Sequence, residues 1–302
     1  MSKSGYAPTV SLMGGRAAPK KRSHWASIVH RFKKNKMAMF GLGLFLVLVF
    51  ICVGAPLFAD YEADAIEQNV YNRNAPPSAE HIFGTDQYGR DMFARIIYGG
   101  RISMFVGVIT VSIAACAGTI IGSIAGYFGG KVDTILMRIM DVFLAIPSML
   151  MAITIVAVLG PNLLNLLISM SISSTPRFSR IVRSAILTVR GNEYVEAARA
   201  CGTSHRRIIL RHIIPNAIGP IIVQASLNVA QTIITVASMS FIGLGIQSPT
   251  PEWGTMLSEG KEVMRYFPHL VIVPGIAIIL AVMSINLIGD GLRDAFDPKM
   301  KN

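Results

Sequence analysis

The sequence predicts an all-α membrane protein with six transmembrane helices and both termini in the cytoplasm. The chain has 302 residues, of which 52% are hydrophobic and only 15% are charged, a balance too apolar for a soluble domain of this size. Its uncharged segments are long enough to cross a hydrocarbon core of about 30 Å, which takes roughly 20 helical residues. Its basic residues gather in alternate connecting segments, as expected of cytoplasmic loops.

Each predicted span is an apolar segment bounded by charged or turn-forming residues. The six segments are 37–59, 102–125, 135–159, 163–182, 216–242 and 270–288. The first is not a secretory signal, because the apolar region of a signal is only about 7 to 15 residues long and lies close to the N-terminus. Because six is an even number, both ends of the chain are expected on one side of the membrane.

Membrane topology explains the net charge of +11. No acidic residue precedes Asp60, whereas basic residues are frequent before it and again between Arg177 and Arg211. Since excess Lys and Arg stays in the cytoplasm, we expect the N-terminus, the segment 193–215 and the C-terminus to be cytoplasmic. Nucleic-acid binding is not indicated, because the basic residues form no single amphipathic surface and no nucleic-acid motif accompanies them.

The segment 193–215 is the longest charged interval within the apolar second half of the chain. Residues 193–200 are good helix formers, Gly202 can take the left-handed conformation that ends a helix, and a second short helix can follow before Pro215. The segment therefore predicts two short helices joined by a turn. On composition alone, a basic cytoplasmic loop is an equal alternative.

The spacing of this segment resembles the Glu-Ala-Ala loop of bacterial ABC importer permeases. Glu196-Ala197-Ala198 is followed after three residues by Gly202, although His212 stands where the family has an aliphatic residue and Ile214 where Leu is usual. The resemblance implies the type I ABC importer permease fold and a coupling helix that sits in a cleft of a cytoplasmic ATPase subunit. The coupling residues it implies are Glu193, Glu196, Ala197, Ala198, Gly202 and Arg206.

A second motif precedes the second predicted span. Residues 84–91 read Gly-Thr-Asp-Gln-Tyr-Gly-Arg-Asp and resemble the signature of the second permease of the dipeptide, oligopeptide and nickel branch of that family, with Ala94 where Ser is common. A capped interfacial turn is the alternative reading. The stretches 243–257 and 286–298 resemble the same branch, so the resemblance extends over about residues 80–298.

Four regions are expected along the chain. Residues 1–36 form a cytoplasmic tail ending in an amphipathic helix at the membrane interface, or alternatively a partner-binding helix. Residues 37–100 hold the first span and an extracytoplasmic loop, and residues 101–290 form the permease core with the coupling loop 193–215. Residues 291–302 form a cytoplasmic C-terminal tail.

Residue patterns in the second and fifth predicted spans indicate helix packing and a transport path, respectively. Gly118, Gly122 and Gly126 recur every four residues, which leaves one helix face bare for close packing within this subunit or against a partner. Gln224, Asn228 and Gln231 share one stripe of the fifth span, which suits a pore wall. Hydrogen bonding between helices is an equal alternative for that stripe.

The outer loop 243–267 contains Pro251, Glu252 and Trp253, predicted to contact a binding protein or to gate the path through an exposed Trp between prolines. Anchoring of Trp253 at the membrane interface is the alternative.

In the third span, Arg138 and Asp141 are three residues apart, which allows a structural ion pair; an ion pathway is the other reading. Pro147 can kink the same span.

The sequence contains no phosphate-binding loop. The run Gly129-Gly130-Lys131 resembles the end of such a loop, but Ala125 stands where the first Gly is needed and Val132 where Ser or Thr is needed. The three cysteines form no Cys-x-x-Cys pair, so neither disulfides nor a metal site are expected.

These observations and the resemblance predict a non-catalytic, multi-pass subunit of the bacterial inner membrane, which forms half of an ATP-driven path for di- or oligopeptides. The implied partners are a homologous permease in a heterodimer, two ATPase subunits that bind ATP and Mg²⁺, an extracytoplasmic substrate-binding protein and membrane lipid. The chain itself would hold no cofactor. Nickel is the alternative substrate, and an ion-coupled secondary transporter or a membrane scaffold are alternatives of other classes.

Overall fold

The computed structural model describes residues 24–297, which are helical apart from turns and loops. Within that range the only β-type pairing is one isolated bridge between Thr85 and Asp91. The predicted tail over residues 1–23 and residues 298–302 of the C-terminal tail lie outside the described residues.

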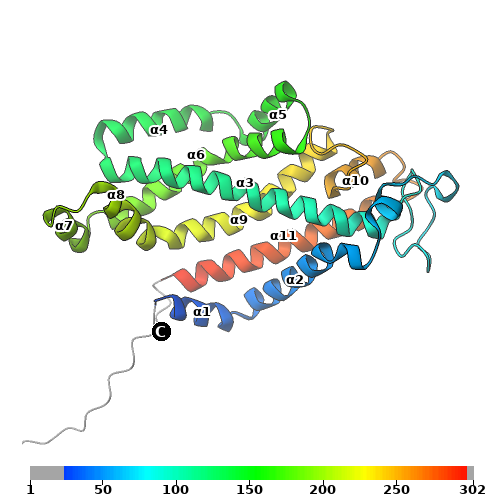
Figure 1. Ribbon diagram of the computed structural model, residues 1–302, viewed down its shortest axis with the longest axis horizontal. Coiled ribbons are helices and arrows are strands. Elements are labelled where there is room, and N and C mark those ends of the chain that lie inside the picture. The colour runs from blue at the N-terminus through cyan, green and yellow to red at the C-terminus, as the bar shows by residue number, and fades with distance from the viewer. Residues whose placement is uncertain (1–23, 298–302) are drawn as a thin grey trace, which may run out of the picture.

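The long helices run side by side along one axis (Figure 1). The elements are α1 (His24–Lys34), α2 (Lys36–Val53), α3 (Met92–Phe128), α4 (Gly130–Leu144), α5 (Ser148–Leu159), α6 (Leu163–Val189), α7 (Glu193–Ala200), α8 (His205–Ile208), α9 (Ile214–Phe241), α10 (Trp253–Gly260) and α11 (His269–Phe296). Shorter turns are η1 (Ala55–Leu57), η2 (Tyr61–Ile66), η3 (Val70–Asn72) and η4 (Ile209–Ile213).

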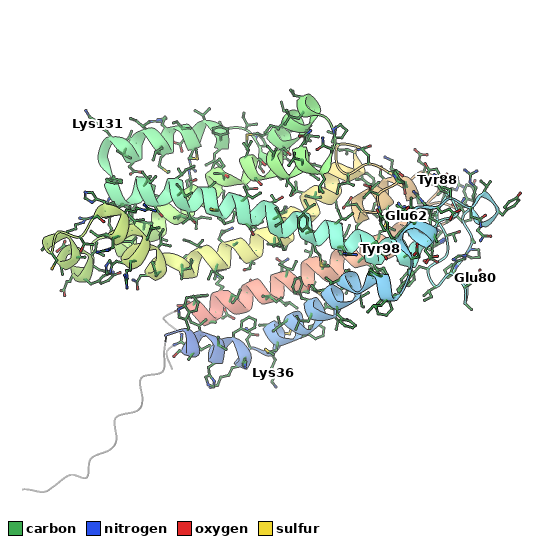
Figure 2. All side chains as sticks on the ribbon, in the orientation of Figure 1. Lys36, Glu62, Glu80, Tyr88, Tyr98 and Lys131 are labelled. Carbon is green, nitrogen blue, oxygen red and sulfur yellow. The ribbon has the colours of Figure 1, made fainter. Side chains whose placement is uncertain are left out.

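The two ends of the bundle carry different elements. In Figure 1, α7 and α8 lie at one end, together with α1 and the last turn of α11. The loop that precedes α3 lies at the opposite end with α10. Labelled charged side chains also lie at these two ends of the bundle: Glu62 and Glu80 lie at the end that holds α10, and Lys131 lies at the end that holds α7 and α8 (Figure 2).

Among residues 24–297, four helical segments are long and apolar enough to cross a membrane. They are α2, α3, α11 and the continuous helix from α8 through α9. The count is five if α4 and α5 are taken as one span, which bends by 80° at a break next to Pro147, where the sequence predicts a kink. The 27-residue α6 carries three arginines and is not in this set.

The backbones of α3 and α6 pack in direct contact. A Cβ placed on Gly118 would lie 2.4 Å from Cβ of Phe178, and one on Gly122 would lie 2.5 Å from the carbonyl oxygen of Ser179. A Cβ on Gly126 would lie 2.9 Å from Ile186. The bare face predicted for this helix therefore meets α6 of the same chain.

Ion pairs fasten α4 to the arginines of α6. Arg183 donates from Nε and Nη2 to the two carboxylate oxygens of Asp133 at 2.5 and 2.6 Å. Arg180 donates to Asp141 at 2.6 Å, in a more exposed position. The expected pairing of Asp141 with Arg138 is wrong, because an arginine on the neighbouring helix reaches the carboxylate instead.

Candidate functional site

The elbow consists of α7, the turn at Gly202 and α8. The first helix matches the predicted range, and Gly202 has φ of +71°, so the predicted left-handed turn is present. A second helix follows the turn, as predicted, and begins at His205, but its predicted end before Pro215 is wrong, because α8 continues through the π-helical turn η4 into α9 without a break. Pro215 directly follows the π-helical turn η4 and lies in the first turn of α9.

One face of the elbow is open to a partner. Glu193, Glu196 and Ala197 are exposed, Arg206 is exposed, and Ala198 is half-buried. Among residues 24–297, no atom lies within 4 Å of a Cβ placed on Gly202, so no steric contact with this part of the chain requires glycine there. The requirement for Gly at this position is conformational.

The opposite face of the elbow is anchored to the bundle. Val195 of α7, Ile208 of α8 and Ile213 are fully buried in one apolar cluster with Val182 and Ile186 of α6. Tyr127, in the last turn of α3, belongs to the same cluster. Because burial of such side chains contributes roughly 1.5–3 kcal/mol each, this cluster holds the elbow against the ends of α3 and α6.

One residue of the stripe on α9, Gln224, borders a groove at the elbow end of the bundle. Gln224 and Asn228 are half-buried and Gln231 is exposed. Among residues 24–297, none of these three amide side chains forms a hydrogen bond with another helix. Gln224 lines a groove of about 1080 Å³ between α1, α6, α9 and the end of α11, whose other polar lining includes Arg31, Asn216 and Arg293.

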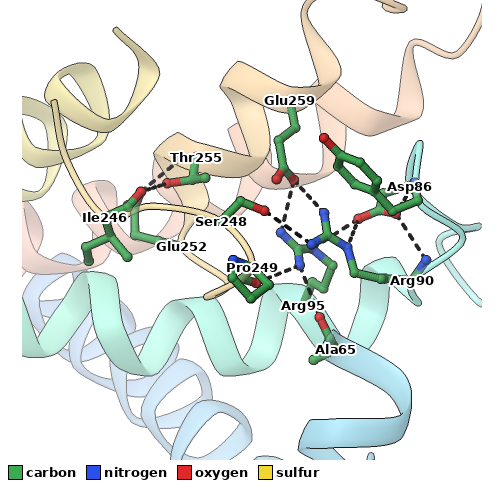
Figure 3. A network of polar contacts seen from close by, with 11 residues as sticks. Ala65, Asp86, Arg90, Arg95, Ile246, Ser248, Pro249, Glu252, Thr255 and Glu259 are labelled. Carbon is green, nitrogen blue, oxygen red and sulfur yellow. Dashed lines mark hydrogen bonds and ion pairs between the residues drawn. The ribbon is translucent and has the colours of Figure 1, made fainter. Parts of the chain in front are cut away.

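The opposite end of the bundle holds a buried polar clamp, formed by Asp86, Arg90, Arg95 and Glu259 (Figure 3). Arg90 donates to Asp86 at 2.6 Å and to Glu259 at 2.9 Å. Arg95 donates to the same oxygen of Glu259 at 3.0 Å, and its Nε lies 3.3 Å from Asp86. Both arginine side chains are fully buried, and the side chains of Asp86 and Glu259 that neutralise them are 6% and 12% exposed.

The motif at residues 84–91 builds the loop that carries this clamp. Gly84 and Gly89 have positive φ, and a Cβ on Gly89 would collide with the backbone of Asn69. The Asp86 carboxylate accepts backbone N–H groups of the turn, and Asp91 caps α3 by accepting from Ala94 at 2.8 Å. These contacts set the position of the two arginines relative to α10.

Pro251, Glu252 and Trp253 are buried, and the expectation of an exposed Trp is wrong. Trp253 is 1% exposed and donates from Nε1 to the carbonyl of Ile96 on α3 at 3.0 Å. Glu252 accepts from Ser103 at 3.0 Å and caps α10. The small residues of α3 beside Trp253 admit the indole, since a Cβ on Gly100 would lie 2.7 Å from its ring.

The sequence did not identify Arg95, Glu259 or Tyr127 as members of a site. The available signal for the clamp was an arginine in the first turns of an apolar helix, because a charge at that depth requires a partner of opposite sign. No sequence pattern indicated a role for Tyr127, since a single aromatic residue at a helix end is common. No group of three or more His, Cys, Asp and Glu side chains able to hold a metal ion occurs among residues 24–297.

A helical bundle in which four or five segments among residues 24–297 are long and apolar enough to cross a membrane has the fold of a multi-pass membrane protein. Comparison with family models gives the particular family. Residues 118–302 match the binding-protein-dependent transport system inner membrane component, and residues 23–77 match the N-terminal TM domain of oligopeptide transport permease C. The chain belongs to this family of ABC importer permeases and is a multi-pass protein of the inner membrane.

Characterised relatives are similar over nearly the whole chain. The dipeptide transport system permease protein DppC of Alkalihalophilus pseudofirmus is 47% identical over 93% of this chain and 91% of its own length. The oligopeptide transport system permease protein OppC of Bacillus subtilis is 40% identical over 93% and 92%. The glutathione transport system permease protein GsiD of Escherichia coli O157:H7 is 42% identical over 93% and 92%.

Solved structures show the same helical fold. A chain of the MetNI methionine ABC transporter in an inward-facing conformation matches with a TM-score of 0.56 and 15% identity, over 67% of this chain and 97% of its own. A chain of an amino acid ABC transporter crystallised with histidines matches with a TM-score of 0.51 and 17% identity, over 65% and 91%.

Proposed function

We propose that this chain is one of two homologous permease subunits that form a heterodimer and together enclose a path for di- or oligopeptides. The observation that carries the substrate class is the similarity, over 93% of the chain, to permeases named for dipeptides and oligopeptides. The proposed complex also contains two ATPase subunits and an extracytoplasmic substrate-binding protein. The permease is the non-catalytic part, and the ATPase subunits bind ATP and Mg²⁺.

The proposed topology is a type I importer permease with six spans and both termini in the cytoplasm. In this topology, α6 and the bent pair of α4 and α5 are the two spans added to the four named above. In support, α6 has 27 residues, enough to cross roughly 30 Å of hydrocarbon, and its arginines are neutralised in part by α4. The elbow, α1 and the end of α11 share one end of the bundle, as a cytoplasmic location for all three requires.

The proposed path runs along the stripe of α9. Neutral amides that form no side-chain hydrogen bond to another helix within residues 24–297 suit contact with water and with the backbone of a peptide, and they argue against a role in joining these helices. The groove beside Gln224 would be the cytoplasmic end of this half of the path. Asn228 and Gln231 would continue the polar surface toward the opposite side.

The proposed coupling surface is the exposed face of the elbow. Its residues are Glu193, Glu196, Ala197, Ala198, Gly202 and Arg206. Small side chains allow close approach of an ATPase subunit, and the two carboxylates offer charge-assisted hydrogen bonds. Because the elbow is anchored to α3 and α6, a movement imposed on it is passed to the spans.

Trp253 is buried, so we place the proposed contact with the binding protein elsewhere at the outer end. Tyr71 is 99% exposed and follows Val70, which is 66% exposed, in the loop before α3. Exposed aromatic and aliphatic side chains are typical anchors in protein interfaces. Pro251, Glu252 and Trp253 would act indirectly, by fixing α10 between α3 and α9.

The test is uptake by vesicles that contain the permease pair, the ATPase subunits and the binding protein. We expect labelled dipeptide to accumulate only with ATP inside and binding protein outside. Accumulation of nickel in place of peptide would replace the substrate class. Uptake driven by an ion gradient without the ATPase subunits would contradict the proposal as a whole.

A further inference from the structure

Tyr127 projects from the last turn of α3 into the elbow. Its side chain is 5% exposed, although it lies at the end of the bundle. The hydroxyl oxygen of Tyr127 lies 2.8 Å from Nδ1 of His205, and the two groups form a hydrogen bond. The guanidinium of Arg199 lies over the ring, 4.9 Å from its centroid. The ring thus has polar contacts on its edge and on its face.

The two contacts come from opposite arms of the elbow. Arg199 belongs to α7 and lies three residues before Gly202, whereas His205 begins α8 and lies three residues after it. The ring of Phe128 adds an edge contact to His205 at 5.6 Å. A change in the angle between α7 and α8 therefore either moves Tyr127 or breaks one of its contacts.

Movement of Tyr127 is movement of α3. This helix continues for 37 residues without a break, a length of about 55 Å at 1.5 Å per residue. Near Tyr127 it is held to α6 by the glycine contacts and by Arg190, which donates to the carbonyl of Gly126 at 2.8 Å. At its other end it carries Arg95, which donates to Glu259 of α10.

We propose that Tyr127 is the positioning residue through which the elbow drives α3, and that its hydrogen bond to His205 is the specific contact that transmits the movement. The inference rests on the proposed coupling role of the elbow. A partner can shift the spans only through a contact that responds to its state, and Tyr127 is the side chain of α3 that contacts both arms. Arg95 and Glu259 then place α10 under the control of the same helix.

The experiment measures peptide imported per ATP hydrolysed in vesicles containing the complete transporter. Tyr127→Phe removes only the hydroxyl, whereas His205→Leu removes the Nδ1 partner of that hydroxyl together with the ring contacts of His205 to Tyr127 and Phe128. Each should lower the ratio roughly threefold to tenfold, the range that the net free energy of one hydrogen bond supplies. The double variant should be no worse than His205→Leu alone, because Tyr127→Phe then has no hydrogen bond left to remove.

A conservative variant separates the bond from general structural damage. In His205→Asn the side-chain oxygen occupies the place of Nδ1 and can accept from the Tyr127 hydroxyl, so the ratio should return to within about twofold of the unaltered protein. Tyr266→Phe, the same chemical change at an exposed position in the loop before α11, is the matched control. The amount of assembled complex should not change in any of these variants.

The outcomes distinguish this inference from the proposed coupling. Unaltered coupling in Tyr127→Phe, strictly additive losses in the double variant, or no recovery in His205→Asn would overturn the role of Tyr127. Gly202→Val serves as the reference for the elbow itself. If Gly202→Val uncouples and Tyr127→Phe does not, only this inference fails; if neither uncouples, the coupling role of the elbow fails first.

Discussion

Glu259→Gln should release α10 from the bundle. The Glu259 carboxylate oxygen accepts from Arg90 at 2.9 Å and from Arg95 at 3.0 Å, and both arginine side chains are fully buried. The amide keeps the shape of the side chain but leaves Asp86 as the single negative charge facing two positive ones. Removing one partner of a buried ion pair costs about 3–5 kcal/mol. At 1.4 kcal/mol per factor of ten, the open population of α10 should rise at least about a hundredfold.

The assay is the labelling rate of a single cysteine at Met256, which is 3% exposed in the closed arrangement, in a chain otherwise without cysteine. Glu262→Gln, an exposed acid three residues further on, is the matched control and should leave the rate unchanged. Adding Arg90→Gln to Glu259→Gln restores neutrality and should recover part of the protection. Labelling of Glu259→Gln at the unaltered rate would refute the clamp as the element that holds α10.

Three further outcomes follow from the same contacts. Gly122→Leu should prevent accumulation of folded permease, because its side chain would enter the α6 backbone, whereas Gly43→Leu, with no atom within 4 Å of its Cβ, should be tolerated; equal amounts on membrane blots would argue against the packing. Asn228→Leu should lower peptide uptake several-fold at unchanged abundance, and unchanged uptake would remove it from the path. Tyr71→Ala should weaken stimulation of ATP hydrolysis by loaded binding protein roughly tenfold, while basal hydrolysis stays constant.

The sequence predicted the elements that depend on local patterns. Apolar length located the four segments that are long and apolar enough to cross a membrane, the glycine repeat located the close face of α3, and Gly202 located the turn of the elbow. Each of these features depends on residues within a few turns of one another. A pattern of this kind can be read from one chain because the backbone itself imposes the period.

Contacts between distant residues were not predicted. Arg95 and Glu259 are 164 residues apart, and no local pattern indicates which acid meets which arginine. Trp253 between prolines suggested an exposed side chain, but the small residues of α3 that receive the indole lie about 150 residues earlier. Asp141 was matched with the nearest arginine in its own helix, whereas the folded chain offers Arg180 from α6.

The central claim is that the elbow couples ATP use to transport, and the ratio of uptake to hydrolysis in Gly202→Val vesicles tests it most directly. A β-branched side chain opposes the left-handed conformation, with φ of +71°, by roughly 1 kcal/mol or more, whereas Gly202→Asn tolerates it and is the control. We expect Gly202→Val, and less severely Glu196→Ala, to leave the complex assembled and hydrolysing ATP with little uptake. Hydrolysis and uptake at unaltered rates in Gly202→Val would contradict the central claim.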